Sequence, residues 1–314
     1  MNPLTALYGG ASALRNSLFD RGVLQSRRLD QPVISVGSLS AGGAGKTPFV
    51  IALGELLRAR GIRFDVLSRG YRRKTRGVLV VEPDGSAADF GDEPLLIARR
   101  LAVPVVVGER RYEAGRVAEQ KFQPQLHLLD DGFQHRSLAR DFDIVLLTAD
   151  DFRDQLLPSG RLREPFRSLE RADAIVLSSG LAADHPALPQ KPLWRVEREL
   201  LLPTLPGAPI AFCGIARPEQ FFAQVRAAGI TPAAQLSFGD HHAYDQSDVQ
   251  RLLAARTKCH AAGFLTTEKD AVNVGPLQRD LEPLAIAVLK LTIDRPAGVV
   301  DTVLARIAEH KPRS

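Results

Sequence analysis

The stretch from Pro32 to Thr47, PVISVGSLSAGGAGKT, constrains the fold of this chain more than any other part of it. Residues 33–36 form a short apolar run between a proline and a glycine, which predicts a buried strand. A glycine-rich segment and the pair Lys46-Thr47 follow, and the residues up to Gly61 then carry apolar side chains at helical spacing. A strand, a glycine-rich loop, Lys-Thr and a helix in this order indicate a P-loop.

The residue types of this loop suit the binding of nucleotide phosphates. Glycines let backbone N–H groups approach phosphate oxygens, and the helix N-terminus adds positive potential. Lys46 would neutralise the β- and γ-phosphates, and the Thr47 hydroxyl would ligate Mg²⁺. Ser40 stands where a P-loop usually has its first glycine. The alternative to a P-loop is a glycine-rich turn that caps an ordinary helix. The predicted nucleotide-binding residues are Ser40, Ala41, Gly42, Gly43, Ala44, Gly45, Lys46 and Thr47.

The remaining pattern predicts an α/β fold. Short apolar runs predict further strands at residues 63–69, 77–82, 103–108, 126–131, 143–148, 174–178, 209–214, 262–266 and 285–291. Strands that alternate with helical stretches favour a P-loop-type parallel sheet with helices on both faces. Prolines 203, 206 and 209 mark a linker, so we expect a P-loop core over residues 1–202 and a smaller α/β domain over residues 203–314.

Polar residues follow several of the predicted strands. Asp130 and Asp131 end an apolar strand, which is the Walker-B pattern in which a carboxylate holds the Mg²⁺ shell. They open the segment DDGFQHR, which is too polar for packing alone and indicates a functional loop. Asp92 lies where a loop enters a helix, and it could cap that helix or face a cleft. Because ligands bind beyond the carboxyl ends of parallel strands, we expect these residues, the P-loop and the segment 156–165 to share one crevice.

Composition and charge narrow the class of protein. The net charge of +5 and the pI near 9.4 suit an anionic partner such as nucleotide, a phospholipid surface or nucleic acid, and do not choose among them. Two distant cysteines match no metal or redox spacing, which fits a reducing compartment. No apolar run approaches the ~20 residues needed to cross a bilayer, and the N-terminus has no secretory pattern. We therefore expect the protein in the cytoplasm.

Two segments leave alternatives open. Residues 3–24 carry an apolar stripe flanked by arginines, which predicts either an interfacial membrane helix or a helix packed on its own domain and broken at Gly9-Gly10. Residues 69–74, RGYRRK, form a basic loop that could bind a sugar phosphate or could simply be solvated.

Taken together, these motifs resemble the tetraacyldisaccharide 4′-kinases (lipid A 4′-kinases) of Gram-negative bacteria. The similarity runs nearly end to end, and Ser40 does not argue against it, since the family relaxes that position. It rests on PLTALYG near the N-terminus, SLSAGGAGKTP, LSRGY, GDEP (91–94), DDGFQHR (130–136), LLPSGRLREP (156–165), FGDHHAY (238–244) and TTEKDAVN (266–273).

The resemblance implies transfer of the γ-phosphoryl group of ATP to the 4′-hydroxyl of a tetraacylated glucosamine disaccharide 1-phosphate, which yields lipid IVA. It implies a peripheral enzyme on the cytoplasmic face of the inner membrane, which favours the amphipathic interpretation of residues 3–24. It also implies a two-stranded linker between the domains, with the nucleotide bound on the large domain facing the small one.

The resemblance also implies roles for single residues. Lys46 and the loop would hold ATP, while Thr47, Asp130 and Asp131 would hold Mg²⁺. Asp92 would accept the hydroxyl proton, with His241 orienting it. The candidates for contacts with the substrate or the transition state are Arg111, Gln134 and Arg163.

The alternative function is a P-loop switch NTPase of the partitioning-ATPase or metallochaperone type, which shares the GGxGKT loop but needs no acceptor base. We expect no nucleic-acid partner, because the sequence has no recognised reader module or interleaved aromatic platform. We infer no obligate protein partner.

Overall fold

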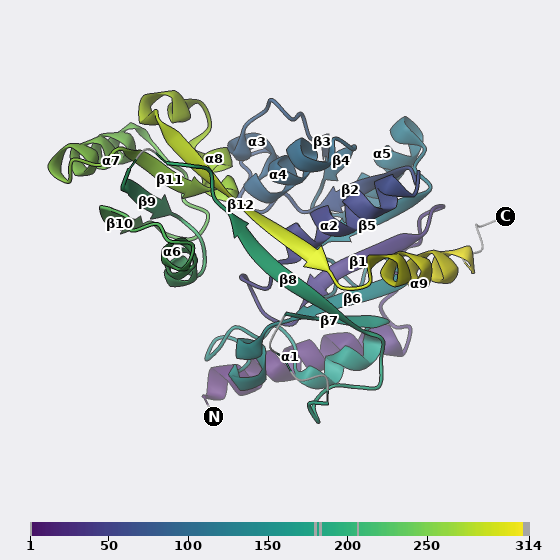
Figure 1. Cartoon of the computed structure of the whole chain (residues 1–314). Coiled ribbons are helices and arrows are strands. Elements are labelled where there is room, and N and C mark those ends of the chain that lie inside the picture. The colour runs from purple at the N-terminus through teal and green to yellow at the C-terminus, as the bar shows by residue number, and fades with distance from the viewer. Residues whose placement is uncertain (1, 179–180, 182–183, 206, 310–314) are drawn as a thin grey trace.

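The computed structural model describes residues 2–178, 181, 184–205 and 207–309. Within these residues, twelve strands form one sheet, as Figure 1 shows. In sheet order the strands are β10 (Ala234–Ser237), β9 (Pro209–Cys213), β11 (Gly263–Thr267), β12 (Leu284–Ile293), β8 (Leu193–Leu201), β7 (Ala174–Ser178), β6 (Phe142–Leu147), β1 (Val33–Ser38), β5 (Leu126–Asp130), β2 (Phe64–Ser68), β4 (Val105–Val107) and β3 (Leu79–Val80).

The sheet confirms the predicted fold class. Neighbouring strands are parallel except for two antiparallel pairs, β12 with β8 and β3 with β4. Every predicted strand is present, with each end within two residues of its predicted position. β8 and β10 have no counterpart among the predicted strands.

Helices cover both faces of the sheet, because side chains alternate along each strand. Leu128 of β5 packs in the cluster that includes helices α2, α4 and α9, and Leu129 packs in a second cluster with α5. The α-helices are α1 (Pro3–Asp20), α2 (Lys46–Ala59), α3 (Ala87–Phe90), α4 (Asp92–Leu101), α5 (Arg111–Phe122), α6 (Pro218–Ala227), α7 (Gln246–Lys258), α8 (Glu268–Val274) and α9 (Pro296–Ala308). Short 3₁₀ helices are η1 (Ala149–Arg153), η2 (Phe166–Arg171) and η3 (Gly275–Leu281).

A buried ionic cluster lies in the N-terminal part of the sheet. Nδ1 of His127 on β5 lies 2.9 Å from the Asp65 carboxylate on β2, and Nε2 lies 3.5 Å from Glu119 on α5. Burial alone would lower the pKa of His127, but the carboxylates of Asp65 and Glu119 raise it to about 9. Burial raises the pKa of Asp65, against the effect of His127. The cluster therefore ties two strands and a helix together around a protonated histidine.

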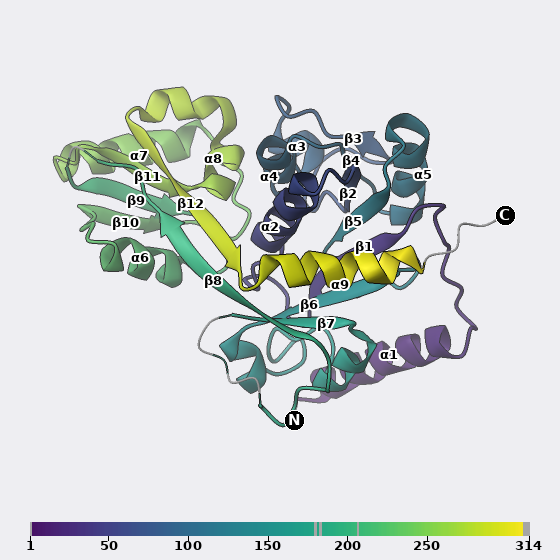
Figure 2. The same ribbon diagram turned by 45° about the vertical axis from the view of Figure 1, so that its right-hand side comes forward.

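Two lobes are visible in Figure 1. We call residues 209–283, with strands β9 to β11, the C-terminal lobe, and the part that carries β1 to β7 the N-terminal lobe. The antiparallel strands β8 and β12 run between them. The last helix, α9, returns to pack against α2 and β6 of the N-terminal lobe (Figure 2). The division into domains at residue 202 stays a prediction.

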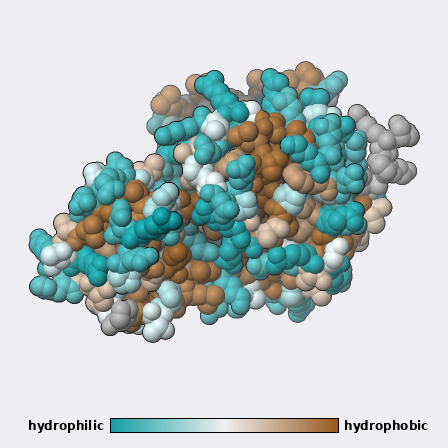
Figure 3. All heavy atoms as spheres, turned by 90° about the horizontal axis from the view of Figure 1, so that it is seen from above, coloured by the Kyte–Doolittle hydropathy of each residue, from teal (hydrophilic) through white to brown (hydrophobic). Residues whose placement is uncertain are grey.

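Helix α1 lies along the edge of the N-terminal lobe and runs without a break across Gly9 and Gly10. Its polar side chains dock on the lobe: the Thr5 hydroxyl lies 2.6 Å from that of Ser159, and Asn16 donates to Glu164. Its exposed face carries an apolar stripe of Leu4, Leu7, Ala11 and Leu14. Leu4 and Leu14, at the two ends of the stripe, are 60% and 62% exposed. On the opposite side of the molecule, hydrophilic side chains are spread over both lobes and enclose hydrophobic areas (Figure 3). No helix in the described ranges has the length and apolar character to cross a membrane.

Candidate active site

The P-loop connects β1 to α2 in the conformation that the sequence predicts. Gly42, Gly43 and Gly45 have φ of +74°, +72° and +85°, in the left-handed region that glycine adopts without strain. Ser40 does not have a positive φ; it forms an antiparallel bridge to Leu162 instead, and its backbone therefore needs no glycine. The N–H of Ala41 also donates a hydrogen bond to the Arg161 carbonyl. Segment 156–165 thus supports the first part of the loop.

Lys46, the first residue of α2, is held by groups at the ends of β1 and β5. Its Nζ lies 3.3 Å from Oγ of Ser38 and 3.4 Å from Oδ1 of Asp131. Arg163 donates to both carboxylate oxygens of Asp131, at 2.9 and 2.7 Å. Although burial would raise the pKa of Asp131, the charges of Lys46 and Arg163 lower it, so this carboxylate stays ionised.

Asp130 differs from its neighbour in its surroundings. Its Oδ2 accepts from the Ser68 hydroxyl at 3.1 Å, and its buried Oδ1 has no hydrogen-bond partner within the described ranges. Burial, together with the charges of Glu93 and Asp131, raises the pKa of Asp130. A buried carboxylate oxygen without a donor, next to a P-loop, is suited to a cation.

Asp92, the first residue of α4, meets the C-terminal lobe. Its Oδ2 lies 2.8 Å from Nδ1 of His241, in the turn after β10, and accepts from Nδ2 of Asn273 at 3.1 Å. Nζ of Lys269 lies 3.1 Å from Nε2 of the same histidine. Because a carboxylate only accepts and an ammonium only donates, Nδ1 carries the imidazole proton and Nε2 accepts.

The charges at this contact are well defined. Burial opposes ionisation of Asp92, but the hydrogen bond from His241 and the charge of Lys269 lower its pKa to about 2. Burial would lower the pKa of Lys269, yet the surrounding carboxylates, Glu93 first, raise it. The His241 imidazole therefore lies between an ionised carboxylate and an ammonium group.

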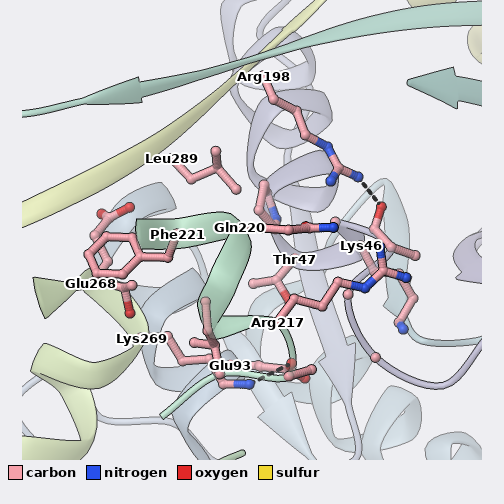
Figure 4. A pocket seen from close by; sticks show the side chains of 18 of the residues that line it. Lys46, Thr47, Glu93, Arg198, Arg217, Gln220, Phe221, Glu268, Lys269 and Leu289 are labelled. Atoms are coloured by element: carbon pink, nitrogen blue, oxygen red, sulfur yellow. Dashed lines mark hydrogen bonds and ion pairs between the residues drawn. The ribbon is translucent and has the colours of Figure 1, made fainter. Parts of the chain in front are cut away.

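A cavity of about 250 Å³ separates the P-loop from the C-terminal lobe (Figure 4). Leu200 of β8 and Leu289 of β12 contribute an apolar wall, and α6 contributes Phe221. Arg198 of β8 donates from NH2 to the Ala44 carbonyl of the P-loop at 2.5 Å. The cavity is also lined by Lys46, Thr47, Glu93, Arg217, His241 and Lys269.

The other predicted residues lie around this centre. Arg111 begins α5 and is buried; burial and the neighbouring Arg69 lower its pKa to about 10. Gln134 donates to the Ser38 carbonyl at 3.1 Å and so supports the end of β1. Sequence reasoning did not single out Arg198, Arg217, Lys269 or Asn273 as site residues, although the last two stand in the quoted TTEKDAVN motif.

The chain matches known proteins over almost its whole length. A family model described as Tetraacyldisaccharide-1-P 4′-kinase (LpxK) matches residues 1–308. The chain belongs to this family. It is 48% identical to the tetraacyldisaccharide 4′-kinase of Koribacter versatilis over 99% of both chains, and 40% identical to that of Geobacter metallireducens over 96% of both.

A solved structure supports the same family membership. The chain is 35% identical to LpxK from Aquifex aeolicus, whose crystal structure is described as an "apo" form in complex with ATP. The two structures superpose with a TM-score of 0.80, covering 97% of this chain and 98% of the other. The resemblance of the motifs and the P-loop-type α/β fold are therefore confirmed, and the switch NTPase is not favoured.

Proposed function

We propose that this member of the family transfers the γ-phosphoryl group of ATP to the 4′-hydroxyl of tetraacyldisaccharide 1-phosphate, giving lipid IVA. The observation that carries the proposal is that Asp92 contacts His241, which lines the same cavity as the P-loop lysine. A buried, ionised carboxylate held by a second lobe serves the transfer to an acceptor hydroxyl, which a switch NTPase does not need.

Positioning and charge neutralisation are the main requirements of phosphoryl transfer. Lys46 would contact the β- and γ-phosphates, and the backbone N–H groups from Gly42 to Thr47 would surround their oxygens. Asp131 and Arg163 would then hold the lysine at the mouth of the loop. Arg111, Gln134 and Arg163 remain candidates for contacts with the substrate phosphate or the transition state.

The residues at the end of β5 fit a magnesium ion. Asp130 offers a buried oxygen without a donor in the described part of the chain, and Asp131 and the Thr47 hydroxyl lie in the same region. Mg²⁺ keeps water and phosphate oxygens as ligands and so needs only one or two carboxylates, which Asp130 and Asp131 would supply. When bound, it would offset phosphate charge.

Asp92 would accept the proton of the 4′-hydroxyl. Its carboxylate is ionised at neutral pH, and its orientation is fixed by His241 and Asn273. His241 acts here as a positioning residue, because Lys269 holds its other nitrogen. A low pKa makes Asp92 a weak base, so its contribution depends on its alignment with the hydroxyl.

We further propose that the protein binds peripherally to the cytoplasmic face of the inner membrane. The stripe of Leu4, Leu7, Ala11 and Leu14 would enter the interface while the polar face of α1 stays docked on the lobe. Arg15, one of the flanking arginines, donates to the Gln134 carbonyl. The proposal therefore rests more on the apolar stripe than on the arginine charges.

A phosphoryl-transfer assay tests the function. Labelled ATP is incubated with the protein in the presence and absence of the lipid A disaccharide 1-phosphate. We expect a labelled lipid product and ATP consumption that depends on the acceptor. ATP turnover that is unchanged when the lipid is omitted, without labelled lipid, would favour the switch NTPase.

A further inference from the structure

Arg217 reaches from the C-terminal lobe to the P-loop. It is the residue before α6, and Figure 4 shows its side chain extending toward the loop that carries Lys46. A Cβ atom added to Gly43 would lie only 2.9 Å from Nε of Arg217, so the guanidinium group packs directly on the loop backbone. The residue is 8% exposed and lines the cavity.

The guanidinium group of Arg217 has hydrogen-bond donors that no described residue satisfies. NH1 forms an ion pair with Oδ2 of Asp150 at 2.6 Å. Nε and NH2 are buried and have no hydrogen-bond partner among the residues that the structure describes. A buried charged group with two unsatisfied donors is costly, which indicates a ligand that is not part of the chain.

The charge around the loop indicates which kind of ligand this is. Three cationic side chains line the cavity beside the loop: Lys46, Arg198 and Arg217. Arg217 also packs against Gly43, and Arg198 against Gly45. Burial and the charge of Arg217 lower the pKa of Arg198, so the two arginines repel each other. Asp150, the partner of Arg217, is 55% exposed, and solvent screens its charge. A polyanion at the loop would relieve this repulsion.

We propose that Arg217 is a ligand of the ATP triphosphate, supplied by the C-terminal lobe. Asp150 holds the guanidinium group before nucleotide binds, and the free Nε and NH2 groups then donate bidentate hydrogen bonds to phosphate oxygens. Since Lys46 belongs to the N-terminal lobe, the triphosphate would also hold the two lobes together. This inference rests on the ATP dependence of the proposed function.

The test compares the binding of ATP and of adenosine, measured by calorimetry without lipid. Arg217→Ala should weaken ATP binding about 10- to 100-fold, as expected for lost charge-assisted hydrogen bonds, and leave adenosine binding unchanged. Arg217→Lys, which keeps the charge, should recover part of the loss. Arg226→Ala is the matched control, because Arg226 lies on α6, the helix that Arg217 precedes, is exposed and does not line the cavity.

Asp150→Asn separates a phosphate ligand from a structural ion pair. Removing the holding carboxylate should leave ATP affinity unchanged or raise it. An equal loss in Asp150→Asn and Arg217→Ala, or an equal loss of ATP and adenosine binding in Arg217→Ala, would overturn the inference. Failure of the wild type to phosphorylate the lipid would refute the proposed function and leave this comparison intact, since no lipid is present.

Discussion

Asp92→Asn should lower kcat by about 10²- to 10⁴-fold, the contribution typical of a general base. The dissociation constant of ATP should change little, because Glu93 and not Asp92 lines the cavity. Asn has nearly the same shape and still accepts hydrogen bonds through its oxygen, so the fold should persist. The loss corresponds to about 3 to 5 kcal/mol of transition-state stabilisation.

His241→Ala should lower kcat less than Asp92→Asn does. The hydrogen bond from His241 is the largest of the effects that lower the pKa of Asp92 from 3.8 to about 2, a shift worth about 2 kcal/mol. Removing the imidazole therefore frees the carboxylate to rotate but also makes it a stronger base. The two effects oppose each other, and we expect a loss of about 10- to 100-fold.

The pH dependence distinguishes this explanation from a purely structural role. Since His241→Ala raises the pKa of Asp92 from about 2 toward its ordinary value of 3.8, the ratio of variant to wild-type kcat should fall as the pH is lowered from about 6 toward 3. The double variant should lie within about threefold of Asp92→Asn, because the two residues act as a unit. A ratio that does not change with pH, together with a double-variant loss equal to the product of the two single losses, would refute the coupling of Asp92 and His241. Asp240→Asn, near the same lysine but not bonded to Nδ1, is the matched control.

Three further predictions follow from other parts of the molecule. Lys46→Ala should lower kcat about 10²- to 10³-fold in the transfer assay, and near-normal turnover would show that this loop does not bind the reacting phosphates. Leu7→Glu with Leu14→Glu should weaken binding to anionic liposomes and leave ATP affinity intact; unchanged sedimentation with liposomes would make α1 purely structural. The pKa of His127 is raised from 6.5 to about 9, so its contribution to stability is complete below pH 6.5 and is lost as the pH rises through 9. In urea unfolding, the stability advantage of the wild type over His127→Gln should therefore shrink by about 3 kcal/mol between pH 6 and pH 10, and a constant advantage would contradict the role of the cluster.

The P-loop and most of the strands were determined by the sequence alone, because these elements depend on residues that are neighbours along the chain. The P-loop, the start of α2 at Lys46 and its end before Gly61 follow from glycine positions and helical spacing within one short stretch. The predicted strands follow from short apolar runs, since burial of a strand is visible in its own residues. β8 and β10 are the exceptions. Burial alternates along β8, but its sequence alternates between apolar and charged residues only from Trp194 to Glu197 and then has charged residues in a row, so the signal for a strand with one buried face was weak.

The tertiary structure decided which distant side chains meet. Asp92 and His241 are 149 residues apart, and only the family resemblance, not their spacing, suggested that they pair. Arg198 and Arg217 reach the P-loop because β8 pairs with β12 and so brings the C-terminal lobe over it. The order of strands in a sheet results from the packing of the whole chain. No local pattern therefore specifies which residues of the second lobe will face the nucleotide.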